Sequence, residues 1–264
     1  MTVASVGAAF APALLQGALV AVPRGNALGS LRRLRSPAWA AVLPGAIVIG
    51  TFAPLGAYSF ALAMIVLAAL AIPPLAVVAA LGVVRGPRGA LVAAVIAAGV
   101  MAAFAGGVTR ELSATAITAL SALALGAGLA RLIPSRWVLV GFACMCALDV
   151  VLIGTGLAQP AADVIARAAA HVPGPVFDQA RLGGVVIDYP DLVLAAAFGG
   201  FLAGQRGQRS AAALVTVFAA TCAVLTPANT MWPATVPVAM AFIALRTVGL
   251  PRSVKPLVPE PATV

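Results

Sequence analysis

The sequence predicts an all-α, polytopic membrane protein with nine transmembrane helices, and three observations lead to that prediction. Of the 264 residues, 62% are hydrophobic and only 9% are charged, whereas a soluble domain usually carries about 25% charged residues. The mean hydropathy is +1.10. The apolar residues are also gathered into runs that approach the roughly 20 residues of a spanning helix. So few charges cannot cover a water-facing surface, but a lipid-facing surface can be apolar.

The first five apolar runs are predicted to form an N-terminal five-helix scaffold over residues 1–136. The stretch Ala38–Val84 is too long for one span, so we divide it near Pro54–Gly56, where proline interrupts a helix. The pair Pro73–Pro74 should kink or break the second of these two helices. The other three runs of the scaffold are Val6–Val22, Gly89–Val108 and Leu112–Ala130.

Four further runs define a second, catalytic-like region over residues 137–250. They are Trp137–Leu157, Gly184–Gly204, Ala211–Leu225 and Met231–Ala244. A long connection of about residues 158–183 joins the first two of them, and its segment AADVIARAAAH predicts a short helix at the membrane interface. Residues 251–264 contain four prolines and are expected to form a disordered cytoplasmic tail.

The basic residues predict the orientation of the bundle. With the N-terminus outside and nine alternating spans, the inner connections hold thirteen of the sixteen basic residues. Cytoplasmic loops of membrane proteins carry such an excess of arginine and lysine. We therefore expect a multi-pass protein of the inner (plasma) membrane with a cytoplasmic C-terminus. The abundance of arginine over lysine, together with many alanines, suggests a bacterial source.

The net charge of +9 does not predict a nucleic-acid partner, because the basic residues are spread over short connections rather than gathered on one face. Cys144, Cys146 and Cys222 lie inside apolar runs and His171 is the only histidine. No metal site or cofactor is expected from them. The partners expected from composition are the lipid bilayer and, with self-association left open, further copies of the chain.

Three acidic residues lie inside apolar runs, where a carboxylate costs roughly 2.5–3.5 kcal/mol on the insertion scale. Asp149 precedes Leu157 by eight residues, and Asp191 follows Gly184 by seven. At 1.5 Å per residue, both lie about 10–12 Å from the same membrane face. The two runs are consecutive and antiparallel, so these carboxyl groups are predicted to meet at matching depth. Asp188 is nearly one turn closer to the surface and is expected to be solvated.

Two facing carboxyl groups at low dielectric cannot both ionise cheaply, so they share one proton. The ionised group can activate water while the protonated group polarises a peptide carbonyl, which is aspartic protease chemistry. Intramembrane acids also mark the proton and cation pathways of transporters, and that alternative stays open. A transporter should show paired halves or broken helices, and the sequence has no such symmetry.

Three segments between about residues 137 and 245 resemble the intramembrane aspartyl proteases of the presenilin and signal peptide peptidase family. LDVVLIGTG, around Asp149, resembles the Tyr-Asp motif of the sixth span. Asp191, in DYPDLVLAAAFGG, stands where the family carries Gly-x-Gly-Asp in the seventh span. Pro233, Ala234 and Thr235 resemble the Pro-Ala-Leu motif at the start of the ninth span.

The resemblance implies a presenilin-like bundle in which Asp149 and Asp191 are catalytic and residues 233–235 shape the substrate pocket. The implied substrate is a transmembrane peptide or the transmembrane segment of a membrane protein. Leu148 replaces the family's tyrosine, Asp188 and Pro190 replace its glycines, and Thr235 replaces its leucine. These departures favour weak activity or an altered cleft, and they leave a non-catalytic relative as a further alternative.

The segment before Asp191 also predicts how a substrate is held. Val185, Val186 and Ile187 are β-branched, so they favour an extended strand that pairs with an unwound substrate. Tyr189 is expected either to donate a hydrogen bond in this site or to anchor the helix at the interface.

Overall fold

We describe the fold from a computed structural model, in which residues 3–25, 27–182, 185–225 and 235–247 are described. Within these residues the chain forms helices and one two-stranded hairpin. Four helices in this part are long and apolar enough to cross a membrane, and five shorter apolar helices accompany them. The protein is therefore helical and of membrane type. The four long helices cover Pro37–Gly56, Tyr58–Gly82, Gly107–Leu132 and Ser135–Gly154.

The N-terminal half follows the predicted apolar runs closely. The division near Pro54–Gly56 is confirmed, because one helix ends at Gly56 and the next begins at Tyr58. Of the kink or break expected at Pro73–Pro74, the break does not occur, since both prolines lie inside one continuous helix. The elements are α1 (Val3–Ala21), the short 3-10 helices η1 (Gly29–Leu34) and η2 (Pro37–Ala41), α2 (Val42–Gly56), α3 (Tyr58–Gly82), α4 (Arg88–Phe104) and α5 (Gly107–Leu132).

The C-terminal half holds the hairpin and the remaining helices. The short helix predicted in the long connection is confirmed as α7. The expectation of a helix from Gly184 onward is wrong, because residues 185–188 form a strand and the helix begins at Tyr189. The elements are α6 (Ser135–Gly154), α7 (Ala158–His171), β1 (Gln179–Leu182), β2 (Val185–Asp188), α8 (Tyr189–Leu202), α9 (Gln208–Leu225) and α10 (Thr235–Thr247).

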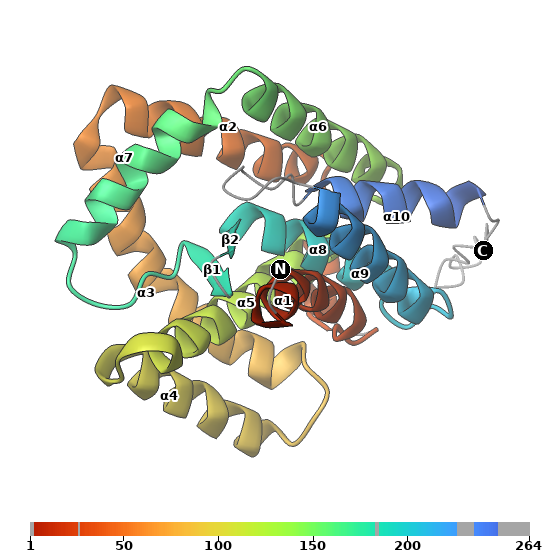
Figure 1. The fold of residues 1–264 in the computed structure, drawn as a ribbon. Coiled ribbons are helices and arrows are strands. Elements are labelled where there is room, and N and C mark those ends of the chain that lie inside the picture. The colour runs from red at the N-terminus through yellow and green to blue at the C-terminus, as the bar shows by residue number, and fades with distance from the viewer. Residues whose placement is uncertain (1–2, 26, 183–184, 226–234, 248–264) are drawn as a thin grey trace, which may run out of the picture.

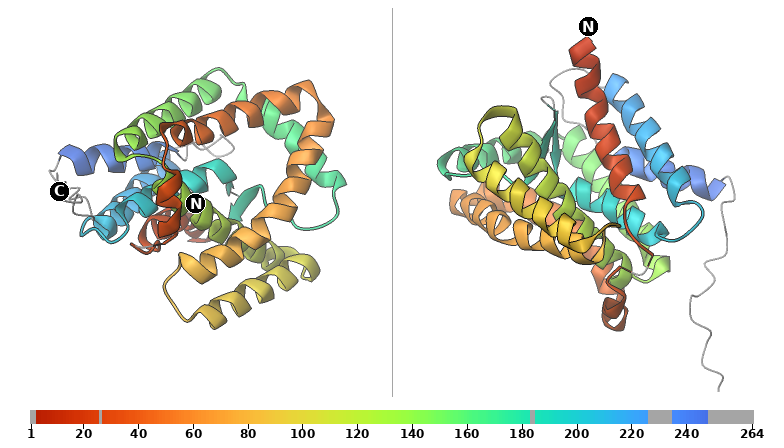
Figure 2. Two further views of the ribbon diagram at one scale, coloured as in Figure 1. Left: turned by 180° about the vertical axis from the view of Figure 1, so that it is seen from behind. Right: turned by 90° about the horizontal axis from the view of Figure 1, so that it is seen from below.

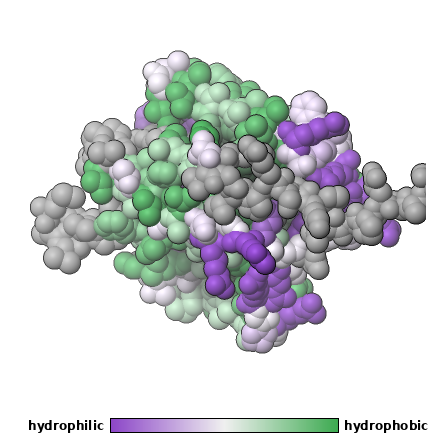
Figure 3. All heavy atoms as spheres, turned by 90° about the vertical axis from the view of Figure 1, so that its right-hand side faces the viewer, coloured by the Kyte–Doolittle hydropathy of each residue, from purple (hydrophilic) through white to green (hydrophobic). Residues whose placement is uncertain are grey.

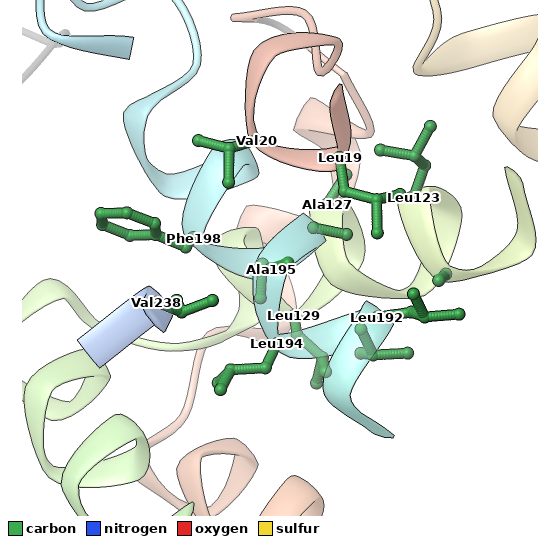
Figure 4. Packing of buried hydrophobic residues seen from close by; sticks show 14 of the residues in the cluster. Leu19, Val20, Leu123, Ala127, Leu129, Leu192, Leu194, Ala195, Phe198 and Val238 are labelled. Atoms are coloured by element: carbon green, nitrogen blue, oxygen red, sulfur yellow. The ribbon is translucent and has the colours of Figure 1, made fainter. Parts of the chain in front are cut away.

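Helix α8 lies at the centre of the bundle (Figure 1). All side-chain positions from Leu192 to Gly200 are buried, because α5, α1, α10, α2 and α9 all contact this helix. Figure 4 shows Leu192, Leu194 and Phe198 packed among side chains of α1, α5 and α10. The second predicted region therefore inserts its central helix between helices of the first.

Glycines allow the closest of these helix contacts. A Cβ atom added at Gly199 would lie 2.6 Å from the Cα atom of Val20 in α1, and one at Gly126 would lie 2.5 Å from the backbone nitrogen of Ala197. Small residues at such crossings let helix backbones approach closely in membrane bundles. Gly199 and Gly126 are therefore positions of close helix packing.

The arginine-rich connections converge at one end of the bundle. The backbone N–H of Arg24 donates to the carbonyl oxygen of Val83, 3.1 Å away. Nε of Arg131, at the end of α5, donates to the carbonyl oxygen of Ala27 at 3.1 Å. The topology of nine alternating spans predicts these connections on one side of the membrane, and in the structure they contact one another. Some of their arginines donate hydrogen bonds to main-chain carbonyl oxygens.

The outward faces of several helices are apolar. Phe104 at the end of α4 is 85% exposed, and Leu70 in α3 is 70% exposed. Figure 3 shows hydrophobic residues over much of one face, with hydrophilic residues gathered toward one end. Figure 2 shows α1 and α9 running side by side. An exterior of this kind is suited to lipid rather than to water.

Candidate functional site

Helix α6 presents the first of the two predicted aspartates. Asp149 lies five residues before the end of α6 at Gly154, and its side chain is half-buried. The hydroxyl group of Thr235 donates a 2.5 Å hydrogen bond to Oδ2 of Asp149. One turn earlier on α6, Sγ of Cys146 lies 3.8 Å from the carbonyl oxygen of Thr235. The start of α10 is therefore attached directly to the Asp149 segment.

The hairpin of β1 and β2 leads into the second aspartate. The strands are antiparallel, with Gln179 opposite Asp188 and Leu182 opposite Val185. The backbone N–H of Tyr189 donates a 3.1 Å hydrogen bond to the carbonyl oxygen of Asp178. This bond extends the ladder by one pair, up to the first residue of α8.

This ladder fixes the direction of the main-chain groups of β2. Hydrogen-bonded and non-hydrogen-bonded pairs alternate along an antiparallel hairpin. Because Asp178 and Tyr189 form a hydrogen-bonded pair, the Arg181–Val186 pair is of the other type. The N–H and C=O groups of Val186 consequently point away from β1. Within the described residues, β2 pairs with β1 alone, so this edge carries no strand.

Asp191 lies in the first turn of α8, directly after the hairpin. Pro190 occupies one of the first two helical positions, where its missing N–H costs nothing and its fixed φ favours helix initiation. The residues that replace the family's glycines thus form a strand-to-helix junction. The positive end of the helix dipole also favours negative charge in this turn.

The fold brings the predicted aspartates within electrostatic range of each other. The carboxyl group of Asp191 interacts with those of Asp149 and Asp188, and that of Asp188 also interacts with Asp149. Asp191 and Asp149 are half-buried, and Asp188 is exposed. We expected Asp188 to be a solvated bystander; it is exposed, but it also belongs to the same cluster of carboxyl groups.

Asp178, in the loop before β1, extends this cluster outward. Its carboxyl group interacts with that of Asp188. Burial raises the pKa of Asp178, while a main-chain hydrogen bond and the charge of Arg181 oppose that increase. Its Oδ1 atom is buried without a hydrogen-bond partner. Asp178 belongs to the long connection of about residues 158–183, and its position in the sequence gives no sign of this proximity.

The other predicted substrate residues differ in their surroundings. The Val186 side chain is 45% exposed and that of Ile187 is 2% exposed, while Val185 is described only through its main-chain pairing. A 2.9 Å hydrogen bond joins the hydroxyl groups of Tyr189 and Ser121, so Tyr189 is attached to α5. Pro233 and Ala234 lie outside the described residues.

Outside the carboxyl cluster, we examined the described chain for a metal site and for other pockets. No group of three or more histidine, cysteine, aspartate or glutamate side chains suited to hold a metal ion occurs in the part searched. A hollow of about 600 Å³ lies between the α2–α3 turn and α7, lined in part by Tyr58, Arg167 and His171. Neither Asp149 nor Asp191 lines it.

Comparison of the chain with protein-family models, with curated proteins and with solved structures found no match.

Proposed function

We propose that this chain is an intramembrane aspartyl protease-like protein that hydrolyses peptide bonds in transmembrane segments. The observation that carries the proposal is the interaction of the Asp149 and Asp191 carboxyl groups, which come from two different apolar helices. Carboxyl groups are costly inside a bilayer and are found there mainly where they function. When two carboxyl groups interact at low dielectric, they share one proton, so that one group acts as an acid and the other as a base.

The proposed reaction uses one shared proton. The ionised carboxylate removes a proton from a water molecule, whose oxygen attacks the peptide carbonyl carbon, while the protonated carboxyl group gives its proton to the carbonyl oxygen. In the resulting gem-diol, the first carboxyl group protonates the amide nitrogen as the C–N bond breaks. The second takes a proton back from a gem-diol hydroxyl. The products are a carboxylic acid and an amine, and both aspartates return to their starting states.

The hairpin supports a proposal for how the substrate is presented. A transmembrane helix hides its carbonyl groups in its own hydrogen bonds, so it must unwind before hydrolysis. The edge of β2 that faces away from β1 offers the N–H and C=O groups of Val186 to an extended chain, which is the mode known as β-strand addition. The strand leads within a few residues to Asp191. Residues 233–235 are proposed to shape the pocket beside it.

The proposal includes nine membrane spans with the N-terminus outside and the C-terminus in the cytoplasm. The four long apolar helices and the five shorter ones support that number. The convergence of the arginine-rich connections at one end of the bundle supports their placement on one side of the membrane. The inner membrane of a bacterium is the proposed location, and the substrate is a membrane-embedded partner.

A second candidate function is proton- or cation-coupled transport. The observation that favours it is the series of interacting carboxyl groups from Asp178 through Asp188 to the pair of Asp149 and Asp191. Acid chains of this kind form proton relays in transporters. A non-catalytic relative of the protease family is the remaining alternative, because Asp188 and Pro190 occupy the glycine positions.

The decisive experiment incubates the purified protein in detergent with single-span peptide substrates. Asp149→Asn and Asp191→Asn should each abolish cleavage, because neither carboxyl group works alone. Asp163→Asn is the matched control, since Asp163 is an exposed aspartate on α7, and it should cleave like the wild type. Cleavage that survives in either dyad variant would refute the protease proposal. Proton or cation flux in proteoliposomes that requires Asp149 or Asp191, without cleavage, would establish the transporter instead.

A further inference from the structure

Asp149 and Asp191 differ in their hydrogen-bond surroundings. Asp149 accepts a hydrogen bond from the hydroxyl group of Thr235, with 2.5 Å between the two oxygen atoms. Thr235 itself is fully buried, with 0% exposure. Among the described residues, the carboxyl group of Asp191 accepts no comparable hydrogen bond. The two members of the pair are therefore not equivalent.

Hydrogen-bond donors that point at a carboxyl group favour its charged form. Bonds of this kind are shorter and about twice as strong as those between neutral groups. The 2.5 Å separation lies at the short end of the range for a hydroxyl group that donates to an ionised carboxylate. A shared proton should consequently reside on Asp191, whose carboxyl group accepts no such bond from the described residues.

We infer that Thr235 is a positioning residue that holds Asp149 as the ionised member of the pair, with Asp191 as the protonated member. This inference rests on the proposed protease function for its chemical consequence. In the hydrolysis described above, Asp149 is then the group that removes the proton from water. Asp191 is the group that gives its proton to the peptide carbonyl oxygen.

Thr235 stands at the position where the resembling motif has a residue without a hydroxyl group. In the resembling Pro-Ala-Leu motif, the corresponding residue is leucine, which has no hydroxyl group to donate. The departure at this position therefore adds a donor that the motif lacks. The hydroxyl bond also joins the start of α10 to α6, where Cys146 contacts the main-chain carbonyl oxygen of the same residue.

Among the described residues, few other titratable groups act on Asp149. Those that interact with it are Asp188 on β2, Asp191 on α8 and Cys146 on α6. Of the other elements that pack against α6, α2 and η2 contain no charged residue. Helix α7 also contacts α6, and it carries Asp163, Arg167 and His171. The only charged residue of α10 is Arg246, near the far end of that helix. The hydroxyl group of Thr235 is thus the neutral donor whose removal should act on this carboxyl group most directly.

The first part of the test compares Thr235→Val, which is similar in shape but lacks the hydroxyl group, with Thr235→Ser, which retains it. Thr235→Val should lower kcat about tenfold with little change in KM, as expected for the loss of a hydrogen bond to a charged group. It should also move the acid limb of the pH–rate profile by about one pH unit toward higher pH. Thr235→Ser should restore most of both. The control is Thr216→Val, because among the described residues the Thr216 hydroxyl group donates to Ala212 of its own helix and to no carboxyl group.

The second part reads the protonation state without any substrate, by infrared spectroscopy of the purified protein in the carbonyl region of protonated carboxyl groups. At neutral pH, Asp191→Asn should remove a band that Asp149→Asn leaves in place, and Thr235→Val should add intensity assignable to Asp149. A band that disappears in Asp149→Asn instead would overturn the inference while leaving the protease proposal intact. Thr235→Val with wild-type kcat and pH profile would do the same. If the infrared bands behave as expected but no variant or wild-type protein cleaves a substrate, the inference is supported and the protease proposal is refuted.

Discussion

The backbone N–H of Tyr189 donates a hydrogen bond to the carbonyl oxygen of Asp178, with 3.1 Å between nitrogen and oxygen. This bond places the first residue of α8 in the ladder of the β1–β2 hairpin. It therefore determines which main-chain groups of β2 face the partner strand and which face outward. Because Asp191 follows two residues later, the hairpin also sets the position of the second aspartate.

Val186→Pro should abolish cleavage while leaving the fold intact. Proline removes the N–H that points away from β1, and proline is tolerated at such edge positions. The side chain of Val186 is 45% exposed, so little packing is lost. The measurement is the cleavage rate beside the thermal unfolding temperature in detergent. Val186→Ala, which keeps the N–H, is the control and should retain activity; equal rates in the two variants would exclude strand addition at this edge.

Asp188→Asn should retain most of the cleavage activity, and its pH–rate profile should shift. The carboxylate of Asp188 interacts with both Asp149 and Asp191, and a like charge disfavours ionisation of its neighbours. Without that charge, the base ionises more readily, so the acid limb of the profile should move toward lower pH. Rates measured across the acid range test this. Complete loss of cleavage in this variant, together with retained cleavage in Asp191→Asn, would show that Asp188 and not Asp191 is the partner of Asp149.

Gly199→Ala should destabilise the protein by about 1–3 kcal/mol, the usual cost of forcing an extra methyl group into a packed interior. The added Cβ atom would lie 2.6 Å from both Cα and the carbonyl oxygen of Val20, so α1 and α8 must separate. The unfolding temperature in detergent measures the effect. Gly99→Ala on α4 is the control, because nothing lies within 4 Å of its added Cβ atom. An unchanged unfolding temperature in the Gly199 variant would contradict the close helix crossing.

Reporter fusions should place the arginine-rich connections on the cytoplasmic side. Fusions after Ser36, Gly86 and Gly207 are expected to give cytoplasmic signals, because these positions lie within or beside connections rich in arginine. A fusion after Gly174, in the connection between α7 and β1, should report the outer side. An external signal from any of the first three would reject both the orientation and the alternation of nine spans.

Much of the helical architecture could be predicted from local sequence. Runs of apolar residues, with arginine, proline and glycine between them, located the helices to within a few residues, including the division between Gly56 and Tyr58. The extended form of Val185–Ile187 was expected from its β-branched residues, but the pairing with β1 was missed, although Gly183–Gly184 is a recognised hairpin signal. The hydropathy of residues 184–204 masked that signal, because an apolar strand and an apolar helix start are alike in composition.

The sequence by itself determined the helical membrane class, the approximate helix boundaries and the rarity of acids in apolar runs, because hydropathy and turn chemistry are local properties. Only the tertiary structure decided that α8 is central, that Asp188 joins the carboxyl groups of Asp149 and Asp191, and that Thr235 donates to Asp149. Each of these depends on contacts between segments far apart in the chain. In a bundle where most faces are apolar, composition does not reveal which faces meet.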